Sequence, residues 1–167
     1  AHLGNGASLC ALQNGRSVDA STGFSTLEGV PMGTRCGALD PGVLLYLLQQ
    51  GMTPAALEDL LYHQSGLLGV SGVSADVRTL QQSESIPARE ALELFALRCA
   101  GEAARLDTTI GGMAALVLTA GISGQCARIH TAICRPLGRV GLRADPVVRV
   151  HDLDCRSSAA GRPRGRG

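Results

Sequence analysis

One arginine stands out because glycine residues flank it on both sides. Arg35 lies between Gly33 and Gly37, within a stretch, residues 26–45, that has a glycine every few residues. Glycine lets a backbone approach a ligand closely, and a guanidinium offers a fixed fork of donors for a carboxylate or a phosphate. The spacing therefore indicates an anion-binding loop, and a plain connecting loop with a solvated arginine fits it about equally well.

Three further segments have residue types suited to binding anions or nucleotides. His2-Leu3-Gly4-Asn5-Gly6 is a glycine turn whose amides can form an anion-binding nest. Asp76-Val77-Arg78 places a carboxylate near a guanidinium, which also fits a surface ion pair contributing about 0–1 kcal/mol. Gly121-Ile122-Ser123-Gly124-Gln125 is a glycine turn after an apolar run, a position where α/β folds bind ligands. Taken singly, each segment is a weak signal.

Capping and turn signals outline the elements that position these segments. N-cap residues followed by proline predict helix starts, and Asn14-Gly15 predicts a hairpin turn. In chain order the predicted elements are a hairpin of residues 7–12 and 17–20, helices over residues 41–50 and from 54 onward, a packed loop over 65–74, a helix over 87–106, a buried strand over 114–119 and a helix over 126–135 ending before Pro136.

The longest predicted helix shows which side chains face the core. Its apolar residues follow one stripe at helical spacing: Leu92, Phe95, Cys99, Ala103 and Leu106. A helix, a buried strand, a glycine turn and a further helix follow one another along the second half of the chain. This succession is typical of an α/β fold.

Composition excludes several functions. The chain has 167 residues, a usual length for one domain. Its net charge of +1 argues against a general nucleic-acid binder. All 15 basic residues are arginines, which excludes the lysine-dependent P-loop and protein-kinase routes to phosphate, as well as Schiff-base chemistry.

The cysteines and the hydropathy pattern indicate a cytoplasmic protein. The six cysteines form no C-x-x-C pair, so we expect reduced thiols and no metal-ligating residues. Cys36, beside Arg35, has either a lowered pKa or the role of a small buried residue, and the second is favoured. We find no signal peptide and no apolar run of 18 residues, and expect no membrane partner.

Met32-Gly33-Thr34-Arg35 resembles a motif of the acetate kinase family. The segments that resemble its other blocks occur in the family's order and at about its spacing, over about residues 1–145: His2-Leu3-Gly4-Asn5-Gly6-Ala7-Ser8, Ser65-Gly66-Leu67-Leu68-Gly69-Val70-Ser71-Gly72 and Thr119-Ala120-Gly121-Ile122. The resemblance implies a partial α/β, RNase H-like domain of the actin-like ATPase, acetate and sugar kinase superfamily. Residues 1–146 would be part of the C-terminal, nucleotide-binding half, and residues 147–167 an Arg- and Gly-rich tail that we expect to be disordered.

The same resemblance implies a function. It is reversible phosphoryl transfer from ATP to acetate, giving acetyl phosphate and ADP, with ATP and Mg²⁺ as cofactors and a homodimer in the full-length family. Arg35 would stabilise the transition state. Residues 2–6 would contact the nucleotide phosphates, and residues 76–78 and 121–125 would bind the adenosine.

Several residues depart from the family pattern. Val77 stands where an aromatic residue is usual, Ala114 stands where an aspartate is usual, and Ser123, Gly124 and Gln125 replace the usual Gly-Glu-Asn. The family's other catalytic residues belong to a first domain that this sequence does not match. Because the chain also begins at Ala1 without methionine, we expect a fragment that is inactive alone. The alternatives are a propionate or butyrate kinase, a non-catalytic nucleotide-binding or scaffolding piece, and a degenerate or frame-shifted product.

Overall fold

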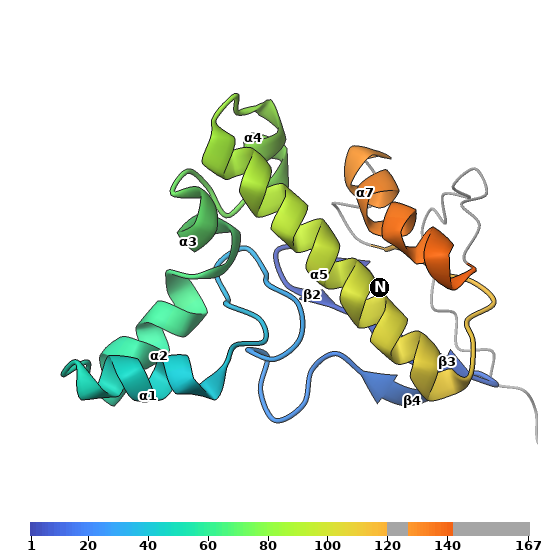
Figure 1. Cartoon of the computed structure of the whole chain (residues 1–167), viewed down its shortest axis with the longest axis horizontal. Coiled ribbons are helices and arrows are strands. Elements are labelled where there is room, and N and C mark those ends of the chain that lie inside the picture. The colour runs from blue at the N-terminus through green and yellow to red at the C-terminus, as the bar shows by residue number, and fades with distance from the viewer. Residues whose placement is uncertain (120–126, 142–167) are drawn as a thin grey trace, which may run out of the picture.

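The computed structural model describes residues 1–119 and 127–141. The predicted turn over residues 121–125 and the tail over residues 147–167 lie outside this part. A long helix, α5 (Ile86–Ile110), runs diagonally through the molecule (Figure 1). Within the described ranges no helix is both long and apolar enough to cross a membrane.

Two short antiparallel hairpins form the N-terminal part. Strands β1 (His2–Leu3) and β2 (Ala7–Ser8) pair with each other, and β3 (Cys10–Gln13) pairs with β4 (Arg16–Ala20). Asn14 and Gly15, between β3 and β4, have φ angles of 53° and 74°, the positive values that a two-residue hairpin turn requires. The predicted turn is confirmed, but the first predicted strand, residues 7–12, is divided, because Ala7 and Ser8 pair with β1 and only Cys10–Gln13 pairs with β4.

The predicted strand over residues 114–119 forms only at its end. Three backbone hydrogen bonds alternate as in a parallel pair: Ala1 N donates to Val117 O at 2.7 Å, Thr119 N to Ala1 O at 2.8 Å and Leu3 N to Thr119 O at 2.9 Å. Val117 is 48% exposed, so the prediction of a buried strand is wrong for this segment. The reason is that, among the described residues, β1 is its only pairing partner.

Helices α1 (Pro41–Gln49) and α2 (Pro54–His63) begin at the predicted residues. The Asp40 carboxylate accepts a hydrogen bond from Gly42 N at 2.8 Å, and the Thr53 hydroxyl accepts one from Ala56 N at 3.2 Å. These two helices lie side by side, away from the β3–β4 hairpin (Figure 1). Although α1 is rich in leucine, none of its residues is buried.

Two short helices occupy the region predicted as a loop and its continuation. Helix α3 (Gly66–Ser71) lies within residues 65–74, so the loop prediction was wrong there. Leu67 is buried, and Gly72, with a φ of 62°, ends the helix in the left-handed conformation. Helix α4 (Val77–Gln82) follows and is capped by Asp76.

Helix α5 supplies most of the core. It extends to Ile110, beyond the predicted end at Leu106, and every residue of the predicted stripe is buried except Leu92, which packs against the core while partly exposed. The rest of its buried face is alanine: Ala88, Ala91, Ala96 and Ala100. These small side chains let α3, α4 and α7 (Ala127–Leu137) pack closely against it.

Helix α7 contributes a second apolar face, and the 3₁₀ turn η1 (Gly138–Val140) follows it. Ile129, Ile133 and Leu137 are buried against α5. The predicted end before Pro136 was wrong, because the helix continues to Leu137. Proline interrupts only the last turn, and burial of Leu137 offsets part of that cost.

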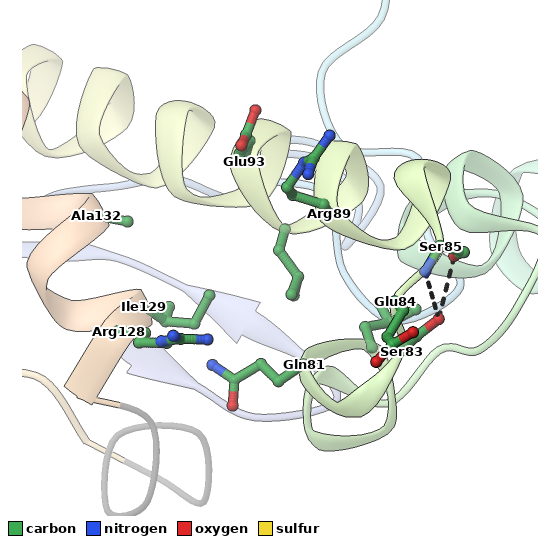
Figure 2. Close-up of a pocket in the computed structure, with 11 residues that line it drawn as sticks. Gln81, Ser83, Glu84, Ser85, Arg89, Glu93, Arg128, Ile129 and Ala132 are labelled. Carbon is green, nitrogen blue, oxygen red and sulfur yellow. Dashed lines mark hydrogen bonds between the residues drawn. The ribbon is translucent and has the colours of Figure 1, made fainter.

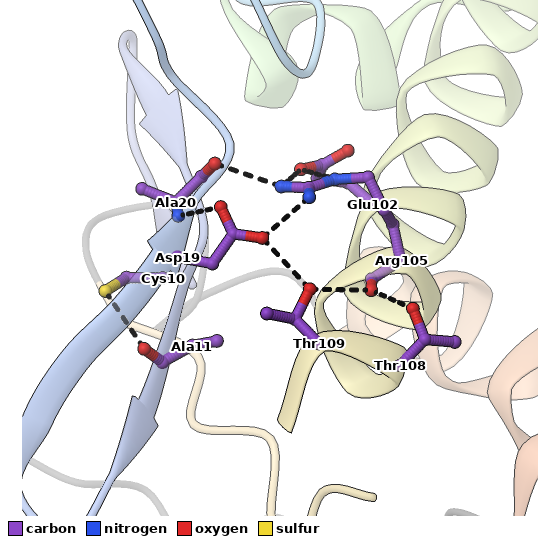
Figure 3. Close-up of polar contacts among 8 residues, drawn as sticks. All are labelled: Cys10, Ala11, Asp19, Ala20, Glu102, Arg105, Thr108 and Thr109. Carbon is purple, nitrogen blue, oxygen red and sulfur yellow. Dashed lines mark hydrogen bonds and ion pairs between the residues drawn. The ribbon is translucent and has the colours of Figure 1, made fainter. Parts of the chain in front are cut away.

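A polar cluster joins the β3–β4 hairpin to α5 (Figure 3). The Arg105 guanidinium contacts the Asp19 carboxylate at 2.7 Å and the Glu102 carboxylate at 2.8 Å, and it donates to Ala20 O at 3.0 Å. The Thr109 hydroxyl donates to the same Asp19 oxygen at 3.0 Å. The hairpin is therefore fixed to the C-terminal half of α5.

Candidate functional site

Gly33 is the point where three predicted site segments meet. Its amide donates to Asn5 O at 3.2 Å, within the turn of residues 2–6. A Cβ placed on Gly33 would lie 3.1 Å from Ala75 O, directly before Asp76. Segments that are far apart in the sequence therefore converge around one glycine whose own size allows the contact.

Thr119, two residues before the fourth segment, lies beside the first segment. Its hydroxyl lies 3.3 Å from His2 Nδ1, and its backbone pairs with Ala1 and Leu3. The turn itself, Gly121 to Gln125, lies outside the described residues. Its assignment as a binding loop stays a prediction.

The loop that carries Arg35 is held by the N-terminal turn of α3. Three amides donate to loop carbonyls, each at 2.9 Å: Ser65 to Thr34, Leu67 to Met32 and Leu68 to Gly33. Helix starts leave such amides without partners inside the helix, so the loop and the helix satisfy each other. The Thr34 hydroxyl adds a hydrogen bond to Tyr62 O at 2.8 Å.

Gly66 fits against this loop so closely that a side chain has no room. Its φ is 62°, and a Cβ there would overlap Met32 O and lie 2.6 Å from Arg35 O. The sequence did not indicate that Gly66 contacts this loop. Its role follows from a tertiary contact, for which the sequence carries no local signal.

The Arg35 side chain is half-buried and free of carboxylate partners within the described part of the chain. Its guanidinium has one weak contact, from Nη1 to the Met32 sulfur at 3.6 Å. It donates no hydrogen bond to a loop carbonyl there, which leaves its donors available to an anion and also fits the solvated arginine of a plain connecting loop. Burial raises the pKa of the neighbouring Cys36 thiol, which supports a small buried residue there.

Asp76 has a structural role that its sequence context did not indicate. Its carboxylate accepts from Thr79 N at 3.0 Å and Arg78 N at 2.9 Å, which makes it the N-cap of α4. These hydrogen bonds, led by that of Thr79, hold the pKa of the Asp76 carboxyl below its ordinary value. Arg78 is exposed, whereas Val77 is 3% exposed and packs in the core, so only its backbone can reach a ligand.

A pocket of about 370 Å³ lies between the end of α4, the start of α5 and the start of α7 (Figure 2). Leu80, Leu92 and Ile129 supply apolar lining, while Gln81 and Arg128 are polar. The sequence predicted Leu92 only as a core residue and did not indicate a pocket, because helix packing rather than a motif brings these residues together. Among the residues that the structure describes, no group of three or more metal-ligating side chains could hold a metal ion.

Comparison with known proteins gives the family. The profile of the Acetokinase family matches residues 1–160, beyond the motif resemblance over residues 1–145. The acetate kinase of Rhodopseudomonas palustris strain TIE-1 is 48% identical over 163 residues, which cover 97% of this chain and 40% of that protein. A propionate kinase of Salmonella typhimurium is 46% identical, over 86% of this chain and 37% of its own length. The chain thus spans about two fifths of the relatives that it matches.

Solved structures agree with this assignment. An acetate kinase from Porphyromonas gingivalis has a TM-score of 0.81 and 34% identity, covering 84% of this chain and 36% of that one. A propionate kinase from Francisella tularensis also has a TM-score of 0.81, with 36% identity, covering 86% of this chain and 38% of that one. The predicted α/β fold of the actin-like ATPase, acetate and sugar kinase superfamily, present in part, is confirmed. The chain belongs to the acetokinase family.

Proposed function

We propose that this chain is the nucleotide-binding half of an acetate kinase, which transfers a phosphoryl group reversibly between ATP and acetate. The observation that carries the proposal is the convergence at Gly33 of three segments, one of which presents the Arg35 guanidinium without a carboxylate partner among the described residues. Relatives at 47–48% identity are named acetate kinase, which supports the substrate.

Arg35 would act on the phosphoryl group during transfer. Charge spreads over the equatorial oxygens of that group in the transition state, and a guanidinium held in place stabilises it. The hydrogen bonds from α3 and the close approach of Gly66 fix the backbone on both sides of Arg35. The chain's contribution is therefore a cation held in position by a rigid backbone.

The open turn over residues 4–6 fits the phosphates of ATP. Asn5 and Gly6 are exposed, and a Cβ on Gly6 would meet nothing within 4 Å, which leaves room for a ligand against the backbone.

We assign the nucleoside to the pocket of Figure 2, whose volume of about 370 Å³ falls in the usual range for ligand sites. Residues 76–78, at the start of α4, and residues 121–125 would complete it.

The described residues do not fit a magnesium site of their own. Within residues 1–119 and 127–141 no cluster of metal-ligating side chains occurs, and the carboxylate of Asp76 caps a helix. Mg²⁺ bound with ATP would neutralise phosphate charge, and we assign it no protein ligand. We further propose that the chain is inactive alone, because it spans only about two fifths of its relatives.

Propionate transfer is the second candidate. The Salmonella typhimurium propionate kinase is 46% identical to this chain, close to the 48% of the Rhodopseudomonas palustris acetate kinase. A chimera in which this chain replaces the matching segment of that acetate kinase tests whether the chain supplies a working nucleotide-binding half. We expect the chimera to phosphorylate acetate. A folded chimera without kinase activity would contradict the proposal, and the choice between acetate and propionate requires the sequence that precedes this segment.

Arg35→Ala in the same chimera tests the mechanism. We expect kcat to fall by about 10³-fold, the lower range for a phosphoryl-stabilising arginine. Calorimetric titration of the 167-residue chain with Mg·ATP tests nucleotide binding separately, with Asp76→Ser as a control that keeps a capping oxygen. Unchanged turnover of Arg35→Ala would remove the catalytic role, and a folded chain that binds no ATP would remove the nucleotide site.

A further inference from the structure

A second pocket lies behind the Arg35 loop and shares no lining residue with the pocket of Figure 2. It has a volume of about 440 Å³ and is enclosed by the loop, α1, α2, α3 and α5. Most of its lining is aliphatic, including Leu39, Val43, Leu47, Leu60, Leu61 and Val70. A cavity of this size and lining is typical of a site for a small apolar ligand.

Arg98 is the single charged residue in the lining of this pocket, and the lining contains no acidic residue. The ion pairs of the described residues all involve Arg105, so Arg98 has no carboxylate partner there. One cation beside an aliphatic cavity favours a ligand with an apolar body and a single negative charge. A guanidinium pairs best with a carboxylate or a phosphate, in bidentate geometry.

Burial under another apolar protein surface is less favourable for the same residue. Arg98 is exposed, and a surface that covered its guanidinium would leave a desolvated charge without a partner. The wall contributed by α1 is open, since Val43 remains 42% exposed. The pocket is therefore accessible in the described structure, and its charge selects an anion.

We propose that this pocket binds a medium-length alkyl carboxylate, with its chain among the leucines of α1 and α2 and its carboxylate on Arg98. The site goes beyond the nucleotide site, and its existence does not depend on the proposed kinase activity. It also touches the loop that positions Arg35, because Cys36 and Gly66 belong to its lining and Cys36 N donates to Leu61 O at 3.1 Å.

Calorimetric titration of the chain with octanoate tests the proposal. Arg98→Gln should weaken binding by at least about ten-fold, the usual loss for a charge-assisted hydrogen bond. Arg135→Gln, an exposed residue of α7 that lines neither pocket, is the matched control and should bind octanoate like the unaltered chain. Octylammonium, with the same chain and the opposite charge, should not compete with octanoate.

Alkylation of cysteine by iodoacetamide locates the ligand independently. Saturating octanoate should slow the reaction of Cys36, which lines the pocket, and leave that of the exposed Cys10 unchanged. Octanoate binding that is insensitive to Arg98→Gln, or that fails to protect Cys36, would overturn the proposal. Sedimentation that shows a dimer unable to bind octanoate would overturn it as well, in favour of a second copy covering the pocket.

Discussion

Two glycine-rich segments lie near Gly33, residues 2–6 and residues 65–72. They differ in how much space surrounds their glycines. Gly66 is enclosed, since a Cβ there would overlap Met32 O and approach Arg35 O. Gly6 is open, because a Cβ added there would have no neighbouring atom within 4 Å. Glycine thus serves two purposes within one site: at Gly66 it lets two backbones touch and fixes Arg35, and at Gly6 it leaves space for a ligand.

Gly66→Ala should disrupt the contact between Gly66 and the Arg35 loop, and we expect it to have the largest effect on stability. The added methyl meets backbone atoms that cannot move independently, and a non-glycine residue with a φ of 62° adds strain. We expect the free energy of unfolding to fall by at least about 2 kcal/mol. Denaturant unfolding measures it, with Gly101→Ala as the control, because Gly101 lies within α5 with open space around it.

Gly6→Ala should have the opposite effect, because it should weaken ATP binding and leave stability almost unchanged. Because nothing surrounds Gly6, stability should change by less than about 0.5 kcal/mol. Binding of Mg·ATP should weaken by about ten-fold if the methyl takes space that the phosphates need. Calorimetry on the two glycine variants decides the comparison. Full ATP affinity in Gly6→Ala would mean that the open turn is only a hairpin connection.

The sequence predicted elements defined by local chemistry and missed those defined by packing. Capping by Asp40 and Thr53 placed two helix starts correctly, and Asn14-Gly15 placed the β3–β4 turn. Helix α3 was missed because its glycines and serines are typical of a loop, whereas its stability comes from hydrogen bonds to a distant segment. The strand over residues 114–119 was overestimated because apolar composition does not reveal how many neighbouring strands pair with it.

The residues of the candidate site also divide into those that sequence motifs predicted and those that only the packing reveals. Motif resemblance identified Arg35, Asn5 and Asp76, and the structure brings their segments together at Gly33. It gave no indication of Gly66 as the support of the loop. Arg98 was equally invisible, because its significance depends on a cavity formed by four helices. Contacts between distant segments therefore require the fold, even where the motifs are clear.

Asp76 sharpens the comparison, because it lies at the edge of the site and its carboxylate is already engaged. Asp76→Ala removes the N-cap of α4 and should lower the free energy of unfolding by about 1 kcal/mol, whereas Asp76→Ser should restore most of it. Since the folded pKa of Asp76 is lowered, its contribution is present above the unfolded pKa and is lost as pH falls through the folded value. Chemical denaturation of the unaltered chain and the two variants, at neutral and acidic pH, measures the loss in each variant and its pH dependence. An equal loss in both variants would assign the aspartate a role other than capping.

His130, like Gly66, is enclosed by neighbouring atoms. Unlike Gly66, it has a buried polar atom without a hydrogen-bond partner among the described residues. The side chain is 5% exposed on α7, and among the described residues its Nε2 accepts or donates no hydrogen bond. Burial lowers the pKa of His130, so the folded protein binds a proton less readily than the unfolded chain does. The protein should therefore lose stability as pH falls below the unfolded value of about 6.5 and show no such change above it.

His130→Phe tests this smallest effect, because it keeps an apolar ring on the face that packs against α5 and removes the titrating group. Between about pH 7.5 and pH 6 the unaltered chain should lose less than about 1 kcal/mol of unfolding free energy, and the variant should lose less than the unaltered chain does. Urea unfolding at the two pH values measures the difference. An identical pH slope in His130→Phe would show that another group titrates. A reduced slope would establish that close packing at α7 encloses a polar atom at a cost, in contrast to Gly66, where close packing satisfies the backbone around it.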